Sequence, residues 1–223
     1  MLILVMLPAA TSADTLTFNA PATLPNDGSG GPNNFDLDHH RAYTWSIRHT
    51  FAPGQTITSA RLVFTGIHNW DNNPNRLFVN LLDYARYSNH NAVRSVVDSS
   101  TDPTSGNGLF SDYFDSENWL ADGAAHVDLG TLRNLTMTPG NITLVFTAQQ
   151  LLALNEFFNV SDNTLAFGFD PDCHFFNNGI RFEFTTNAPV PEPATMTLLG
   201  TGLAGLYYRR RRRKQQQEAQ QGS

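Results

Sequence analysis

The stretch Tyr43-Thr44-Trp45-Ser46-Ile47-Arg48-His49-Thr50-Phe51 alternates strictly between two kinds of side chain. Its odd-numbered positions are aromatic, isoleucine or histidine, and its even-numbered positions are threonine, serine or arginine. Successive side chains of a β-strand point to opposite faces of a sheet, so a period of two residues indicates a strand. This stretch therefore predicts a strand with one buried and one solvated face.

Other segments repeat this mixture of β-branched, aromatic and polar residues. Turn signals separate several of them, at Ala52-Pro53-Gly54, Thr138-Pro139-Gly140 and Asn177-Asn178-Gly179. The further predicted strands are Leu16–Phe18, Ile57–Thr65, Arg76–Asp83, His126–Leu129, Ile142–Thr147, Thr164–Phe169 and Ile180–Thr185.

One segment departs from this alternation. Thr147 followed by Gln150 forms the pattern of a capping box, and Leu151, Leu154 and Phe158 then recur at helical spacing. These residues predict one short helix over 147–158, packed on the end of a sheet. Many short strands with one helix predict an all-β protein, an antiparallel β-sandwich with a jelly-roll-like arrangement.

The charge of the folded part restricts its partners. Asp14 to Ala188 spans 175 residues, which suits one domain. Without the six basic residues 209–214 and the acids Glu192 and Glu218, the chain keeps 8 basic and 18 acidic residues, a formal charge of −10. Such a body repels nucleic acids and anionic membranes, and it is compatible with cations and neutral glycans.

The C-terminal stretch VPEPATMTLLGTGLAGLYYRRRRRK, residues 190–214, has three parts. Pro191-Glu192-Pro193 cannot lie inside a helix. The uncharged run 194–208 would rise about 22 Å as a helix, which is short against a hydrocarbon core of about 30 Å. Arginines 209–213 and Lys214 then hold the C-terminus on the cytoplasmic side. The segment predicts a single transmembrane sorting helix, followed by a disordered tail over 215–223.

This order of elements resembles the PEP-CTERM sorting signal of exported bacterial proteins. The resemblance covers residues 189–214 and implies processing by exosortase, a membrane-bound, cysteine-protease-like enzyme. It also implies a transient inner-membrane anchor, and then a place at the cell surface or in the exopolysaccharide matrix. The residues that carry the sorting motif are Pro191, Glu192, Pro193, Arg209, Arg210, Arg211, Arg212 and Arg213.

The first residues fit export. Met1 to Leu7 is an apolar run, and Thr11-Ser12-Ala13 places a small residue before Asp14, as signal peptidase requires. No basic residue precedes the run, which predicts a truncated signal peptide over 1–13 whose true start lies upstream.

The first candidate site is Asp170-Pro171-Asp172-Cys173-His174. We predict it to be a turn or long hairpin loop between two strands. Asp170 and Asp172 with His174 suggest a metal site, for calcium or, through the histidine, a transition metal. The alternative is turn chemistry, with aspartates that cap backbone N–H groups. Cys173 is the only cysteine, so no intrachain disulfide is possible.

The second candidate site is Asn69-Trp70-Asp71-Asn72-Asn73-Pro74-Asn75-Arg76. Asp71, Asn73 and Asn75 match the opening of a calcium-binding EF-hand loop, but Arg76 stands where glycine is required. The stretch is therefore no EF-hand. Asp71 remains a metal candidate, and Trp70, Asn73 and Asn75 could bind a sugar by stacking and hydrogen bonding. The alternative is that these polar residues only keep an exposed loop soluble and bind no ligand.

Two more stretches hold carboxylates, Asp36-Leu37-Asp38-His39-His40-Arg41 and Asp112 to Glu117. The first stretch is weak evidence for metal binding. In neither stretch does the sequence identify two carboxylates that could form a catalytic pair. The sequence predicts a non-catalytic, structural or adhesive protein with no certain cofactor, whose partners are exosortase, signal peptidase with the export machinery, and exopolysaccharide. The alternative is a carbohydrate-binding module with structural calcium, and a glycan hydrolase is a third reading.

Overall fold

The computed structural model describes residues 13–21, 36–39, 41–83, 93–97, 111–115, 125–160, 163–187 and 200–210. The chain divides into two units, Ala13–Asn187 and a second that joins Met1–Ser12 to Ala188–Ser223. All residues of the two hydrophobic clusters lie in Ala13–Asn187, which we call the body. The body therefore has its own core, the property that allows a domain to fold by itself.

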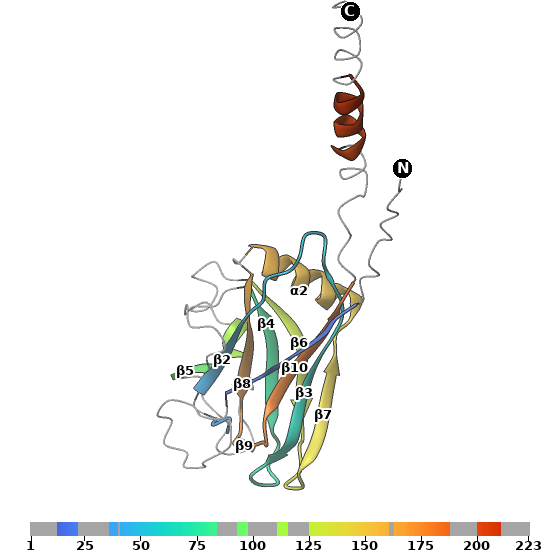
Figure 1. Ribbon diagram of the computed structural model, residues 1–223. Helices are drawn as coiled ribbons and strands as arrows, with labels where there is room; N and C mark the ends of the chain where they lie inside the picture. Colours follow the sequence, from blue (N-terminus) through green and yellow to red (C-terminus); the bar gives the residue numbers. More distant parts are fainter. Residues whose placement is uncertain are drawn as a thin grey trace, which may run out of the picture. The chain divides into compact units, whose positions relative to one another are not determined.

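Two antiparallel sheets form the body (Figure 1). In the first sheet the order is β1 (Thr15–Asn19), β10 (Ile180–Thr186), β3 (Ile57–Asn69) and β7 (Gly140–Val145), and β9 (Phe175–Phe176) pairs with the end of β3. In the second sheet the order is β5 (Val93–Val97), β2 (Arg41–Arg48), β8 (Thr164–Pro171), β4 (Arg76–Leu82) and β6 (His126–Arg133). The predicted all-β antiparallel sandwich is confirmed, and the jelly-roll arrangement stays a prediction.

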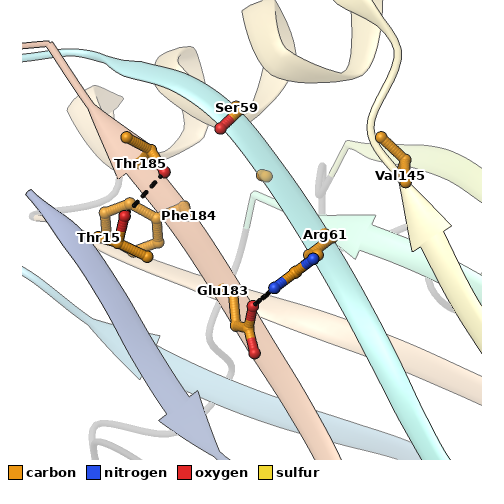
Figure 2. Close-up of a pocket in the computed structure, with 8 residues that line it drawn as sticks. Thr15, Ser59, Arg61, Val145, Glu183, Phe184 and Thr185 are labelled. Atoms are coloured by element: carbon orange, nitrogen blue, oxygen red, sulfur yellow. Dashed lines mark hydrogen bonds and ion pairs between the residues drawn. The ribbon is translucent and has the colours of Figure 1, made fainter.

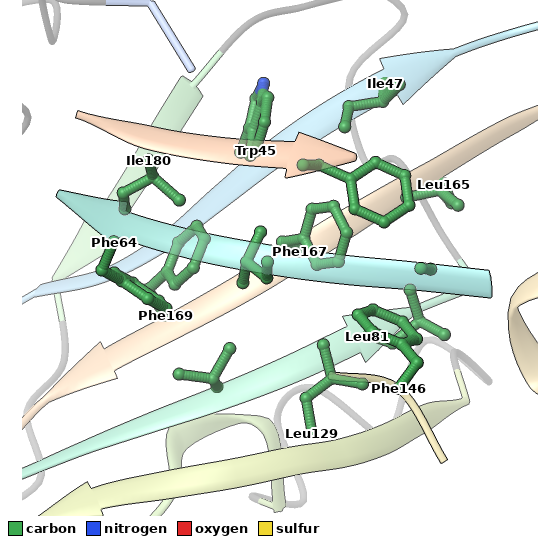
Figure 3. Close-up of a cluster of buried hydrophobic side chains, with 14 of the residues drawn as sticks. Trp45, Ile47, Phe64, Leu81, Leu129, Phe146, Leu165, Phe167, Phe169 and Ile180 are labelled. Carbon is green, nitrogen blue, oxygen red and sulfur yellow. The ribbon is translucent and has the colours of Figure 1, made fainter. Parts of the chain in front are cut away.

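Aromatic rings fill the space between the sheets (Figure 3). In the second sheet the ring of Trp45 lies 5.6 Å from that of Phe167, and Phe167 in turn lies 4.8 Å from Phe182 of the first sheet. Phe64 and Phe169 make a second contact between the sheets, edge to face at 5.9 Å. Such pairs stabilise a core beyond the area they bury, and they explain the phenylalanine-rich composition.

Every predicted strand is present, with ends that differ by a few residues. β3 continues to Asn69 and β8 to Pro171, beyond their predicted ends. Two strands of the described residues were not predicted, β5 and the two-residue β9.

The expectation of a solvated outer face is wrong for Ser46 of β2, which is buried. The outer face of the second sheet is covered in part by the short 3-10 helix Tyr113–Asp115, which places Phe114 in a cluster with Ala42 and Ala166. β8 is consequently buried at every position.

The predicted helix and its capping box are confirmed. α2 spans Ala148–Val160 and lies at one end of the sandwich (Figure 1). The N–H of Thr147 donates to Oε1 of Gln150 at 2.8 Å, and the N–H of Gln150 donates to Oγ1 of Thr147 at 3.3 Å. Asn155 fastens the helix to β3, because its side chain hydrogen-bonds both the N–H and the carbonyl of Ile57.

The hairpin predicted around residues 170–174 is wrong. β8 belongs to the second sheet, whereas β10 belongs to the first, so the connection crosses from one sheet to the other. Asp170 is not in a loop but inside β8, opposite Phe78 of β4. β9 interrupts the crossing by pairing with β3.

Candidate functional site

The three candidate stretches of the sequence meet at the end of the sandwich opposite α2. The N–H and carbonyl of Leu37 both hydrogen-bond Phe175, at 3.0 and 2.9 Å, and Phe175 pairs with Asn69 on its other side. The N–H of Trp70 donates to the carbonyl of His174 at 3.1 Å. We call this region, formed by residues 36–39, 69–76 and 172–178, the loop end.

Strand alternation divides the side chains of the loop end between two faces. Leu37, Asn69 and Phe175 are direct partners across the strands, and all three are fully buried. The neighbouring positions carry the outer rings: His174 lies 4.6 Å from Phe176, which lies 5.4 Å from His68. A row of three rings therefore covers the outside of β9.

Trp70 is the exposed aromatic residue of the loop end, with 55% of its surface accessible. Its neighbour Asp71 organises the loop, because the Asp71 carboxylate accepts hydrogen bonds from Nδ2 of Asn69 at 3.0 Å and from the N–H of Asn73 at 2.9 Å. Nδ2 of Asn73 donates to the same carboxylate, at 2.5 Å. Trp70 thus stands on a loop that is internally braced.

Asn75, predicted to bind a ligand, has a structural position. It is buried, its Nδ2 donates to the carbonyls of Asn73 and Leu135, and its Oδ1 accepts from the N–H of Leu135. This amide ties the β3–β4 loop to the β6–β7 loop. The β6–β7 loop brings Met137, 52% exposed, to the same end of the body. Sequence reasoning missed Met137, for which no local signal exists.

The structure separates the metal candidates. Asp170 lies in β8, where its Oδ2 accepts from the N–H of Tyr113 at 2.8 Å. Asp71 and His174 are both at the loop end, but the acidic neighbour of His174 is Asp38, 3.9 Å from its Nδ1. In the described part of the chain, no three or more His, Cys, Asp or Glu side chains come together in a way that could hold a metal ion.

The first stretch contributes Asp38 and His39, whose Oδ1 and Nδ1 lie 3.1 Å apart. Asp36 is buried beside them, and His40 lies outside the described residues. At the loop end, Oδ1 of Asn69 and Nε2 of His174 are buried and make no hydrogen bond within the described residues.

Cys173 does not have the environment of a nucleophile. Its Sγ lies 4.0 Å from Oδ1 of Asp71, and burial raises the pKa of the Cys173 thiol. Since the thiolate is the reactive form, a raised pKa makes this cysteine less reactive at neutral pH.

Two polar features lie outside the loop end. A shallow hollow of about 380 Å³ lies on part of the outer face of the first sheet (Figure 2). Within it Arg61 and Glu183 form an ion pair, and the hydrogen bond from Arg61 lowers the pKa of Glu183. On the second sheet, burial raises the pKa of Asp112, although Nδ2 of Asn80 donates to it at 2.7 Å.

The sorting segment is described only in part. Residues 200–210 are helical and exposed, and they include Arg209 and Arg210. Pro191, Glu192, Pro193 and Arg211 to Arg213 lie outside the described residues, as do the predicted signal peptide up to Ser12 and the tail. No helix of the described segments has the length and the apolar character needed to cross a membrane.

Comparison with known proteins concerns this same segment. The family model of the PEP-CTERM protein-sorting motif matches residues 189–213, which confirms the resemblance seen in the sequence. The motif indicates export, transient membrane anchoring and sorting by an exosortase. No curated protein matches the chain.

Proposed function

We propose that this chain is an exosortase-processed surface protein whose body is a non-catalytic adhesive module that binds neutral polysaccharide through its loop end. The sorting motif supports an extracellular place of action. The loop end supports adhesion, because it combines an exposed aromatic ring with amide and carboxylate groups on a braced loop.

The observation that carries the proposal is the exposure of Trp70. An indole ring that is mostly accessible on the tip of a β-sandwich costs hydration free energy, and exposed apolar groups of this size mark interaction sites when they recur together. Met137 on the adjoining loop is the second such group. The flat face of an indole suits the apolar face of a sugar ring, and the polar neighbours suit its hydroxyls.

The hydrogen bonds of Asp71 prepare this surface before any ligand arrives. Because Asn69 and Asn73 already bind the Asp71 carboxylate, the backbone on both sides of Trp70 is fixed. A surface ordered in advance loses less conformational entropy on binding. The charge of the body, −10, favours a neutral polymer over a uronate-rich or phosphorylated one.

Affinity electrophoresis of residues 13–187 through gels that contain neutral or acidic polysaccharides tests the proposal. We expect a neutral polysaccharide to retard the wild type and Trp70→Ala to migrate freely. Leu152→Ala is the matched control, because Leu152 is 72% exposed but lies on α2. Equal retardation of both variants would refute a role for Trp70. Release of reducing ends from any of the polymers would identify a hydrolase instead.

A further inference from the structure

Among the residues that the structure describes, the first sheet ends in two open edges. Within the described residues, β1 pairs only with β10 and β7 pairs only with β3. Figure 2 shows the two edge strands through Thr15 on β1 and Val145 on β7, with β10 and β3 between them. An open edge presents backbone N–H and C=O groups to which another strand can pair.

Hydrogen bonds at the strand ends show which residues face outward. The N–H of Phe146 donates to Ala60, so the even-numbered residues of β7 bond to β3 and the odd-numbered residues point away. The N–H of Ala20 donates to Ile180, so the even-numbered residues of β1 bond to β10. The outward-facing backbone groups belong to Thr15, Thr17 and Asn19 on β1 and to Asn141, Thr143 and Val145 on β7.

Neither edge carries the usual protection against pairing. β1 (TLTFN) and β7 (GNITLV) contain no charged residue and no proline. In contrast, the edge strand β6 of the second sheet contains Asp128 and Arg133 and a bulge at Gly130, whose φ is 139°. Charges and bulges are the features by which natural sheets prevent association through their edges.

The inward side chains of both edges are apolar and incompletely covered. Leu16 and Phe18 of β1, and Ile142 and Leu144 of β7, are partly buried and pack against the margin of the core. A strand added at either edge would cover them further if its own inward residues were apolar.

We propose that β7 of one copy pairs with β1 of a second copy, so that the first sheet continues from molecule to molecule. The strands of this sheet alternate in direction from β1 to β7, so β7 meets the next β1 in the antiparallel sense. With Thr17 opposite Thr143, every outward-facing backbone group has a partner. This register also places Leu16 beside Leu144 and Phe18 beside Ile142 on the core side, and Asn19 beside Asn141 on the outer side.

Each junction joins two different edges, so the copies associate head to tail and the assembly can grow beyond a dimer. It does not depend on the proposed function, since the loop end takes no part in it. The charge of −10 on each body opposes association. Raising the salt concentration from about 0.15 M to about 1 M shortens the screening length from about 8 to about 3 Å. The repulsion between bodies then becomes weaker, so high salt should favour the association.

Sedimentation velocity of residues 13–187 at rising protein and salt concentrations tests the proposal. We expect species larger than a dimer in the wild type and in Thr143→Val. Thr17→Pro and Thr143→Pro each remove one backbone N–H that faces away from the sheet. The hydrogen bonds from β1 to β10 and from β7 to β3 are kept. Each proline variant alone should be monomeric. Their equimolar mixture should form a dimer and nothing larger, because only one intact β7 and one intact β1 remain.

Self-association of Thr17→Pro would show that β7 pairs with itself and would overturn the proposal, as would a wild type that stays monomeric throughout. If circular dichroism shows that the proline variants are unfolded, the two double variants T17E/T143E and T17E/T143R decide. The first places like charges opposite each other at the junction and should be monomeric, whereas the second should associate at least as well as the wild type. Equal behaviour of the two would overturn the register and the proposal.

Discussion

Phe114 lies directly against the backbone of Gly168. A Cβ atom built on Gly168 would come within 2.6 Å of Cε2 and 2.7 Å of Cζ of this ring. Both residues are enclosed on the outer face of the second sheet, where Phe114 belongs to a small cluster with Leu82 and Ala166. Glycine at this position is therefore required for the 3-10 helix to seal the sheet.

Gly168→Ala should destabilise the body by about 1 to 3 kcal/mol, the usual cost of overpacking. Urea unfolding of residues 13–187 measures the loss. Gly140→Ala is the matched control, because a Cβ there meets nothing within 4 Å, and its stability should hardly change. Phe114→Leu should recover part of the loss in the Gly168→Ala background, and no recovery would contradict this explanation.

His49 should make the body less stable at mildly acidic pH. Its ring lies 4.6 Å from Phe51 and 5.5 Å from Phe184, and burial lowers the pKa of His49 below its ordinary value of 6.5. The unfolded chain therefore binds the proton more readily. The stability contributed by the neutral ring is complete above pH 6.5 and is lost as the pH falls below that value.

Melting temperatures of wild type and His49→Phe between pH 8 and pH 5 check this (about the range in which histidine titrates). The fall toward acid should be shallower in the variant. Parallel curves would mean that other groups cause the acid sensitivity.

Calcium should leave the melting temperature of the body unchanged. The Asp71 carboxylate already binds Asn69 and Asn73, and Asp170 binds the N–H of Tyr113, which is the behaviour of turn and loop caps. A calcium site at a hundredfold excess over Kd would add about 2.7 kcal/mol, or roughly 5 to 10 °C for a domain of this size.

Thermal melting with EDTA and with calcium separates the two cases. A rise with calcium in the wild type that disappears in Asp170→Asn/Asp172→Asn would place a site in that segment. A rise that disappears only in Asp71→Asn would place it at the loop end and would favour the carbohydrate-binding module with structural calcium.

Replacing Pro191 and Glu192 by alanine should block processing, because both residues lie in the matched motif. In the native host the variant should keep the mass of the unprocessed chain and remain with the membrane fraction. Thr195→Ala is the control in the same segment and should be processed normally. A variant with the wild-type mature mass and release would contradict the assignment of these residues.

The sequence predicted those strands and the helix that are determined by residues close together in the chain. The alternation around Trp45 follows from strand geometry, and the reciprocal bonds of Thr147 and Gln150 need only one helical turn. β9 could not be found in this way, because it exists through its pairing with Leu37 and the end of β3. The cluster of Phe114 with Ala42 and Ala166 likewise depends on segments that lie far apart in the chain.

The candidate site shows the same division. Short polar motifs singled out Trp70, Asp71 and His174 separately, since each lies in a stretch that can be recognised by itself. Their convergence follows from the crossing of the chain between the sheets, which no local pattern specifies. The same crossing placed Asp170 inside β8, away from the loop in which the sequence put it.

The position of β10 has a mechanical consequence. This strand is hydrogen-bonded along both sides, to β1 and to β3, and it runs from the loop end to Thr186, where the chain leaves the body. A tension applied between a polymer held at the loop end and the end of the body at Asn187 acts along the strand axis. Both ladders then resist in shear, so that many hydrogen bonds must break together rather than one after another. A sandwich arranged in this way is suited to bear load.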